Sequence, residues 1–271
     1  MGLKVACVSD DCVNTGDIAA IPTNWFNFEH TRVRFGEPVN SDDDLIVSGG
    51  GVLQTEEHAY KLLNQIKSAR RCVVWAPGLQ YPYGEMRGQA PQWIHNMNRN
   101  SSRCMVRIRD AGLGIPWLPC VSCMHSDFDR LIQKEPEHSF VCYMGSEYFG
   151  LDINHRYLCC HQSLPQSKVL EFLASGETVV TSSYHGLYWA CLLNRKVIAI
   201  PSQRNSKFFR LPFSYTISDT SNWQASINTP TPTNGTELIH YCRDLQKTFC
   251  CKVMRFLDLD SPSFVEPTEI D

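Results

Sequence analysis

Hydrophobic residues in this chain gather in short runs that alternate with segments of helical periodicity. Runs rich in valine, isoleucine and leucine predict buried strands at 4–8, 44–48, 72–76, 105–108, 139–144, 178–181 and 197–200. Apolar residues at three- and four-residue spacing predict helices at 56–70, 167–175, 185–193 and 236–257. Strands that alternate with helices are typical of βαβ units and parallel sheets, so the pattern predicts an α/β protein.

The alternation is interrupted at residues 112–129, which read GLGIPWLPCVSCMHSDFD. This segment is rich in turn formers and aromatic residues, and we interpret it as a crossing between two domains. We expect an N-terminal α/β domain at 1–125 and a C-terminal one at 135–257. Residues 258–271 hold five acidic residues and no basic one, which predicts an acidic tail.

The composition favours a water-soluble globular protein. Hydrophobic residues make up 43% of the 271 residues, and the net charge of −3 gives no electrostatic reason to expect nucleic-acid binding. No apolar run approaches the ~20 residues that span a bilayer. The basic side of 236–257 could contact an anionic membrane surface, but a solvated helix face is favoured, so we expect at most peripheral membrane association.

The cysteines and the first residues bear on localisation. The chain has thirteen cysteines, several of them inside predicted strands, and it opens directly on a strand without the basic start of a signal peptide. Without secretion, reduced and buried thiols are favoured over a disulfide framework. We therefore expect a cytoplasmic protein.

Candidate functional residues follow the predicted strands at their carboxyl ends, where parallel sheets bind ligands. Asn14, Gly16 and Asp17 follow the first strand, and the triplet 49–51 follows the second. Glycines let a ligand approach the backbone and leave amides to bind an anion, although a tight turn explains the triplet equally well. No Gly-Lys-Ser/Thr follows the triplet, so it is not a Walker phosphate loop.

Another strand ends at Arg109. An arginine in this place can hold a carboxylate or a phosphate with two hydrogen bonds. A structural pair with the adjacent Asp110 is an equally good interpretation of the same residues.

The run 179–201, VVTSSYHGLYWACLLNRKVIAIP, places hydroxyl groups and a histidine between a strand and a helix. Ser182 or Ser183 can cap the helix, and His185 then falls in its first turn. The helix dipole favours a neutral imidazole there, which suits a base near pH 7. A packed histidine beside a cap fits the same pattern. Beyond the last strand, Arg204 and Lys207 add cations suited to a phosphorylated donor.

Two possible metal sites are disfavoured. Cys120 and Cys123 with His125 have the spacing of metal ligands, but no second cysteine pair closes a tetrahedral site. The run 42–44, Asp-Asp-Asp, resembles the metal-binding Asp-x-Asp of glycosyl transfer. It precedes its strand, however, and so lies away from the ligand edge, where a solvated turn is favoured. We expect neither a metal nor a cofactor.

Several of these motifs resemble the polysaccharide pyruvyl transferase family and occur in that family's order. They are Asn14-x-Gly16-Asp17, DLIVSGGGVL at 44–53, VRIRD at 106–110 and TSSYHGLYWACLLNRKVIAIP at 181–201. The resemblance implies two Rossmann-like domains with parallel sheets facing a central cleft, as in two-domain GT-B-like glycosyltransferases. It also implies work on cell-surface or capsular glycans.

The resemblance further implies an activity. Members of the family move a pyruvyl group from phosphoenolpyruvate onto two sugar hydroxyls as a ketal. Their junction reads Ser-Arg-x-His-Gly, with the arginine and the histidine at the donor, whereas this chain has Ser183 in place of the arginine. Loss of that cation suits a less charged donor region, such as the ribose or the sugar of a nucleotide sugar.

We therefore predict a metal-independent glycosyltransferase that moves a sugar from a nucleotide sugar to a sugar acceptor. Pyruvyl ketal transfer from phosphoenolpyruvate is the first alternative, and a non-catalytic glycan-binding protein is the second. The predicted catalytic residues are His185 and Asp17. The predicted donor-binding residues are Arg109, Ser182, Ser183, Tyr184, Gly186, Arg204 and Lys207. Backbone, anion or acceptor contacts are assigned to Asn14, Gly16, Gly49, Gly50 and Gly51.

Overall fold

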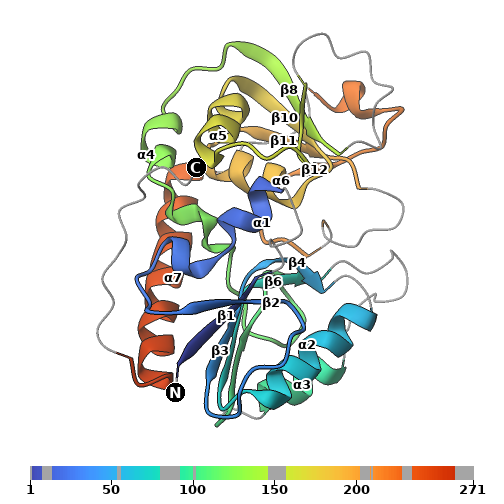
Figure 1. Ribbon diagram of the computed structural model, residues 1–271. Helices are drawn as coiled ribbons and strands as arrows, with labels where there is room; N and C mark the ends of the chain where they lie inside the picture. The colour runs from blue at the N-terminus through green and yellow to red at the C-terminus, as the bar shows by residue number, and fades with distance from the viewer. Residues whose placement is uncertain are drawn as a thin grey trace.

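The computed structural model describes residues 2–7, 14–53, 56–79, 92–99, 102–145, 157–201, 208, 210–227 and 234–259. The described part contains two separate five-stranded sheets and a two-stranded ribbon, and every pair of neighbouring strands is parallel (Figure 1). This confirms the α/β class with parallel sheets. The division into domains at 1–125 and 135–257 stays a prediction.

The first sheet, here the N-terminal sheet, has the spatial order β2 (Thr31–Arg34), β1 (Leu3–Cys7), β3 (Asp44–Val47), β5 (Cys72–Trp75), β7 (Cys104–Arg107). Alternate residues of a strand face opposite sides of the sheet. Leu45 and Val47 accordingly join a core beneath α2 (Glu56–Ser68) and α3 (Gln92–Arg99), whereas Ile46 joins the core on the other side. A short ribbon of β4 (Gly50–Leu53) and β6 (Pro77–Leu79) stands at its carboxyl edge.

The second sheet, here the C-terminal sheet, has the order β12 (Thr216–Ile217), β11 (Lys196–Ala199), β10 (Gly176–Thr181), β8 (His138–Met144), β9 (Tyr157–Cys159). One face packs with the helices α4 (Asp127–Leu131), α5 (Gln166–Ala174) and α6 (Tyr184–Leu192). The other face is covered by the short turn η5 (Trp223–Ser226), whose Trp223 joins Val180 and Ile198 in a small core. Both sheets are thus buried on two sides, which explains their nearly continuous apolar strands.

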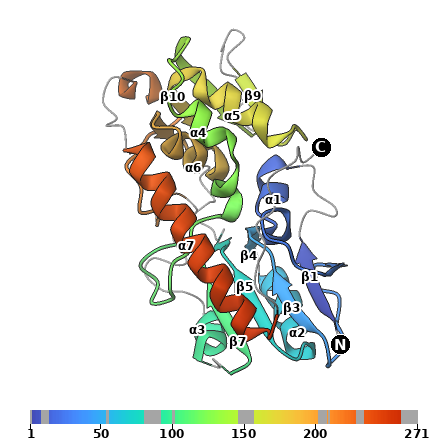
Figure 2. The same ribbon diagram turned by 90° about the vertical axis from the view of Figure 1, so that its left-hand side faces the viewer.

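The last helix, α7 (Gly235–Phe256), connects the two sheets. It begins beside α6 and runs down along the N-terminal sheet (Figure 2). The Trp75 indole N–H donates to Gln246 Oε1 at 2.9 Å, and the rings of Trp75 and Phe249 lie 4.9 Å apart. One hydrophobic cluster therefore contains residues of both sheets and of α7. The helix predicted at 236–257 is confirmed, and it lies against the N-terminal sheet as well as against α6.

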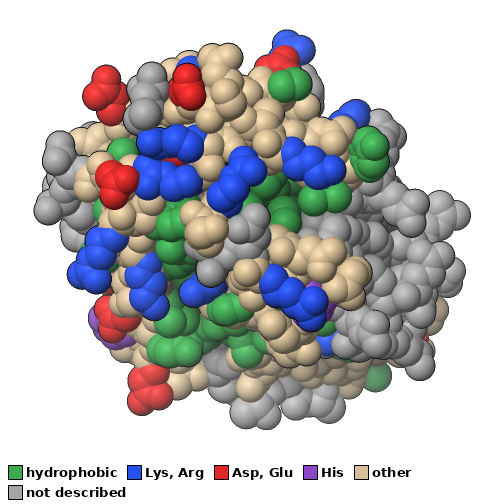
Figure 3. All heavy atoms as spheres, turned by 90° about the horizontal axis from the view of Figure 1, so that it is seen from below, with side chains coloured by type: hydrophobic (Ala, Val, Ile, Leu, Met, Phe, Trp, Pro, Cys, Tyr) green, Lys and Arg blue, Asp and Glu red, His purple; other side chains and the backbone are tan. Residues whose placement is uncertain are grey.

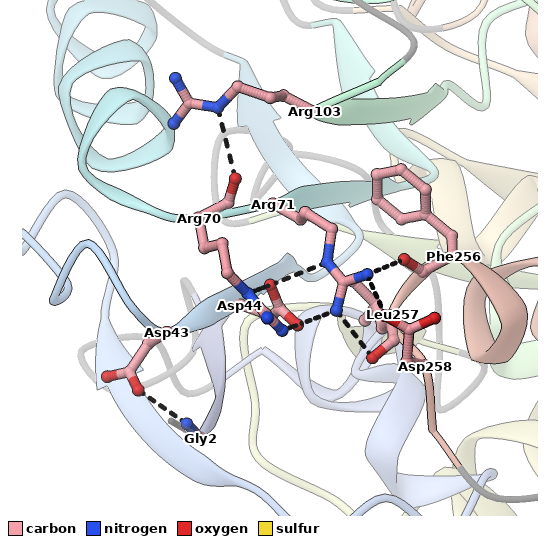
Figure 4. Close-up of polar contacts among 9 residues, drawn as sticks. All are labelled: Gly2, Asp43, Asp44, Arg70, Arg71, Arg103, Phe256, Leu257 and Asp258. Atoms are coloured by element: carbon pink, nitrogen blue, oxygen red, sulfur yellow. Dashed lines mark hydrogen bonds and ion pairs between the residues drawn. The ribbon is translucent and has the colours of Figure 1, made fainter.

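Ion pairs and hydrogen bonds join the end of α7 to the N-terminal sheet (Figure 4). Both Asp44 oxygens accept hydrogen bonds from Arg70 and Arg71, at 2.6–3.2 Å. The Arg71 guanidinium also donates to the backbone oxygens of Phe256 and Leu257, at 2.6 and 2.9 Å. The arginine thus satisfies carbonyls that the end of a helix leaves without partners.

The expectation of a solvated turn at 42–44 is wrong for two of its three residues. Asp43 and Asp44 are buried, because Asp43 accepts from the Gly2 N–H at 2.8 Å and Asp44 holds the arginines. Asp42 alone is exposed. In the described ranges, no group of three potential ligands could hold a metal ion.

On the face of the molecule seen from below, lysine and arginine side chains gather among hydrophobic ones (Figure 3). No helix within the described ranges is long and apolar enough to cross a bilayer.

Of the predicted acidic tail, Asp258 and Leu259 are described, and Asp258 pairs with Arg71 at 2.8 Å. The rest of the tail lies outside the described residues.

Candidate functional site

The candidate site lies where the carboxyl ends of the two sheets meet. The short helix α1 (Thr15–Ala19) stands between the sheets (Figure 1). The start of α1, the ribbon β4–β6, the turn after β7 and the start of α6 contact one another there. Ligand-binding residues gather at the carboxyl ends of parallel strands, and most of the predicted residues do lie together at this junction.

The turn between β10 and α6 is built by the predicted serines. The Ser183 hydroxyl accepts from the Gly186 N–H at 3.4 Å and caps α6, as expected. The Ser182 hydroxyl accepts from the Gly145 N–H at 2.9 Å and joins β10 to the end of β8. A Cβ at Gly186 would lie 2.3 Å from Thr181 Oγ1, so only glycine lets the start of α6 pack this closely on the end of β10. Both hydroxyls therefore hold the turn and are buried.

His185 is enclosed in this arrangement, with only 5% of its surface exposed. Its Nε2 lies 3.4 Å from Cys120 Sγ, which accepts a hydrogen bond from the Ser122 hydroxyl. Burial raises the pKa of the Cys120 thiol, so the thiol keeps its proton and can donate it to Nε2. The two side chains thus share a buried contact in which the role of each depends on the imidazole tautomer.

The other edge of His185 touches α1. Asn14 caps this helix by accepting from the Gly16 N–H at 2.8 Å. A Cβ at Gly16 would lie 2.0 Å from His185 Nδ1, so the imidazole packs directly on the glycine. The imidazole is thus held between Cys120 and the first turn of α1.

Replacing Gly16 with alanine tests this contact. The added methyl group has no room, and overpacking of this kind typically costs about 1–3 kcal/mol of unfolding free energy. Chemical unfolding should show this loss for Gly16→Ala. The control is Gly2→Ala, whose Cβ would meet only Asp43 Oδ1 at an ordinary 3.5 Å. Equal stabilities of the two variants would contradict the packing of His185 on α1.

The glycine triplet supports Asp17. Gly50 has φ of +99°, a conformation that favours glycine, and a Cβ there would lie 2.7 Å from Asp17 Oδ1. The Gly51 N–H donates to the same oxygen at 3.3 Å. Gly49 packs on the backbone oxygens of Ala20 and Trp75. Gly49 thus joins β3 to β4, Gly50 and Gly51 open β4, and the Gly51 amide binds a carboxylate of the protein itself.

Arg109 is the most unusual side chain of the site. Only 3% of it is exposed, and its guanidinium carbon lies 3.7 Å above the ring of Tyr184. On another side it packs on Gly78, where a Cβ would lie 1.9 Å from Nε. Among the described residues, its Nη1 and the Tyr184 hydroxyl are both buried without a hydrogen-bond partner. Because a buried unpaired donor is costly, an anionic ligand would satisfy a group that the protein leaves open.

Arg109 and Asp110 do not form the structural ion pair considered as an alternative. No ion pair joins them in the described part of the chain, and Asp110 Oδ2 instead accepts from the Leu79 N–H at 2.8 Å. Burial raises the pKa of Asp110 to about 6, against the opposing effects of the Arg109 charge and of that hydrogen bond.

The raised pKa of Asp110 predicts a pH dependence of stability. Asp110 takes up a proton more readily in the folded state than in the unfolded state, where its pKa is 3.8. The contribution of protonated Asp110 to stability is therefore complete below pH 3.8 and is lost as pH rises through about 6. A difference of about two pKa units corresponds to about 3 kcal/mol. Urea unfolding between pH 4 and 8 should show this decline in the wild type and not in Asp110→Asn, which keeps an acceptor for Leu79. Parallel pH profiles would refute the prediction.

Two predicted donor-binding residues and one predicted metal spacing remain. Arg204 and Lys207 lie outside the described residues. Cys120 and His125 do not come together as metal ligands. Cys120 lies at His185, whereas the His125 ring packs on Trp25 at 5.8 Å. No pattern in the sequence indicated that Cys120 and Gly78 belong to the site. In the sequence, Cys120 is a cysteine at a turn, and Gly78 belongs to a Pro-Gly step after a strand.

Comparisons with known proteins do not identify the chain. No protein-family model matches it, and no curated protein does. A solved structure of a functionally uncharacterised protein from Klebsiella pneumoniae aligns with 74% of this chain and 84% of that chain, at 16% identity and a TM-score of 0.47. Similarity at this level carries no argument about fold or function.

Proposed function

We propose that this chain is a metal-independent transferase that builds glycans, using a phosphorylated donor and a sugar acceptor. The observation that carries the proposal is the buried Arg109 guanidinium at the junction of the two sheets, whose Nη1 has no hydrogen-bond partner in the part of the chain that the structure describes. A cation enclosed in this way binds an anionic group far more strongly than one exposed to water. The donor proposed first is a nucleotide sugar.

The surrounding residues supply the other requirements of group transfer. An acceptor hydroxyl must lose its proton as it attacks the electrophilic carbon, and a neutral His185 is suited to take that proton. Asp17 lies next to Gly16, which touches the imidazole, and so provides a carboxylate at the same place. Arg109 would stabilise the negative charge that develops on the leaving phosphate.

Pyruvyl transfer from phosphoenolpyruvate is the second candidate, and one observation favours it. The preference for a nucleotide sugar rests on Ser183, which suits a less charged donor, yet the Ser183 hydroxyl caps α6 and is buried. Ser183 is therefore not presented to a donor in the described arrangement. Arg109 can in turn hold the carboxylate of phosphoenolpyruvate with two hydrogen bonds.

A thermal-shift panel separates these candidates. A ligand at 100 times its Kd stabilises the folded state by about 2.7 kcal/mol, which is readily measured. Stabilisation by UDP-glucose, UDP-galactose or GDP-mannose supports glycosyl transfer. Stabilisation by phosphoenolpyruvate alone supports pyruvyl transfer. If neither class raises the melting temperature, the transferase proposal fails and the non-catalytic glycan-binding protein takes its place.

A further inference from the structure

A cavity lies between α2 and α3 at the amino edge of the N-terminal sheet, whereas the candidate site lies at the carboxyl edge. Its volume is about 350 Å³, and it is lined by Leu63, Ile66, Lys67, Asn96, Met97, Arg103 and Cys104. The second halves of both helices and the first residue of β7 supply most of this lining. The amino edge of the sheet faces downward in Figure 1, and the face seen from below carries cations among hydrophobic side chains (Figure 3).

The inner wall of this cavity is apolar. Ile66 and Met97 belong to the core beneath α2 and α3, and the half-buried Leu63 packs on the same core. Cys104 is 9% exposed, and burial raises the pKa of its thiol, so the thiol stays uncharged. The volume falls within the ~300–1,000 Å³ of pockets that hold small molecules. An apolar chain placed here would be removed from water, which is favourable.

The outer wall carries two cations. Lys67 and Arg103 are both exposed, and no acidic side chain is among the described residues that line the cavity. Arg103 donates from Nε to the Arg70 backbone oxygen at 3.3 Å and from Nη2 to the Ala69 backbone oxygen at 2.5 Å. These bonds satisfy carbonyls beyond the end of α2 and fix the guanidinium beside the cavity.

The charge of these two cations is not balanced locally. The groups that Arg103 binds are neutral carbonyls, and no carboxylate forms an ion pair with Lys67 or Arg103 in the ranges that the structure describes. A negatively charged group would therefore complement this end of the cavity.

The two walls together restrict the chemistry of a ligand. A free phosphate would leave the apolar wall in contact with water, and an amine would be repelled by the cations. We infer that this cavity is a second ligand site, which takes a single-chain amphipathic anion such as a medium-chain carboxylate. The chain lies between α2 and α3, and the anionic head lies at Lys67 and Arg103. This inference goes beyond the proposed function and does not depend on it.

The test is calorimetric titration of the whole protein with octanoate at pH 7.5. Two further probes separate the contributions of chain and charge: acetate has the carboxylate without the chain, and octylammonium has the chain with the opposite charge. The variant Leu63→Phe fills the cavity from its half-buried side, and Lys67→Glu reverses one of the charges. The control for filling is Ile18→Phe, which fills a different cavity, between α1 and the segment that leads into α5.

The control for charge is Lys252→Glu, because Lys252 is an exposed lysine of α7, on the other face of the N-terminal sheet. Octanoate should bind the wild type and both controls equally, with a Kd of about 1 mM or below. Acetate and octylammonium should bind at least about tenfold more weakly than octanoate.

The affinity for octanoate should fall by about tenfold in Leu63→Phe and by about fivefold or more in Lys67→Glu. Because Lys67 is exposed, Lys67→Glu tests the inference even if Leu63→Phe does not fold. Three results would each overturn it: no binding of octanoate to the wild type, octylammonium binding as tight as that of octanoate, or unchanged octanoate affinity in Lys67→Glu.

Discussion

Replacement of His185 with alanine should lower the turnover of each folded molecule by about 10²-fold or more. Loss of a general base commonly costs 10²–10⁴-fold in rate, and His185 is the imidazole at the junction of the sheets. Its Nε2 lies 3.4 Å from Cys120 Sγ, so the buried thiol holds the ring in place. The assay is transfer from whichever donor the thermal-shift panel identifies.

The same substitution should also reduce stability, and a control must separate the two effects. The His185 ring packs on Gly16 and lies 5.1 Å from the Trp189 ring, so its removal leaves a cavity. His125→Ala serves as the control, because that ring packs on Trp25 away from the site. It should lower the melting temperature and leave turnover per folded molecule unchanged. The same pattern in His185→Ala would show that His185 only packs.

Replacement of Asp44 with alanine should lower the free energy of unfolding by about 3 kcal/mol. Removing one partner of a buried ion pair costs about 3–5 kcal/mol, and the lower end applies because Arg70 is one-third exposed. The substitution leaves Arg70 and Arg71 adjacent without their shared carboxylate. It also frees the arginine that satisfies the last carbonyls of α7. At about 2–4 °C per kcal/mol, the melting temperature should fall by about 6–12 °C.

The pair of Arg243 with the exposed Asp129 provides the control for Asp44. Asp129 is 59% exposed, so Asp129→Ala should cost no more than about 1 kcal/mol. An equal loss in the two variants would contradict the view that Asp44 anchors α7.

The Asp44 cluster also predicts loss of stability in acid. Burial alone would raise the pKa of Asp44, but the hydrogen bonds from Arg70 and Arg71 outweigh it and lower the pKa below 3.8. This contribution is therefore present above pH 3.8 and is lost as pH falls through the lower, folded-state pKa. Asp44→Ala should lack this part of the acid transition.

The main elements of the fold could be predicted because burial on both faces leaves apolar runs in the sequence. The helices α6 and α7 begin one residue before their predicted starts, since capping and apolar periodicity mark both. The edge strand β2 was missed because its residues, Thr-Arg-Val-Arg, are mostly exposed and carry no apolar run. The ribbon β4–β6 was missed because its strands contain Gly-Gly and Pro-Gly, which read as turns.

The site could be predicted only as a set of residues at strand ends. The carboxyl-end rule places Asp17, Arg109 and His185 at one junction without knowledge of their orientation. The contact of Gly16 with His185 joins residues far apart in the sequence, and no local pattern encodes it. The burial of Asp44 could not be foreseen for the same reason, because its partners lie on another segment.

We propose that the buried Arg109 holds the anionic part of a donor. The most direct test is calorimetric titration of that donor into Arg109→Leu, with Arg107→Leu as the control. Arg107 is a cation of the same region that lies 5.4 Å from the Phe249 ring, away from Tyr184. A charge-assisted hydrogen bond contributes about 1.5–3 kcal/mol, so donor affinity should fall by about 10- to 150-fold in Arg109→Leu and stay unchanged in Arg107→Leu. Equal donor affinity in the two folded variants would contradict the account.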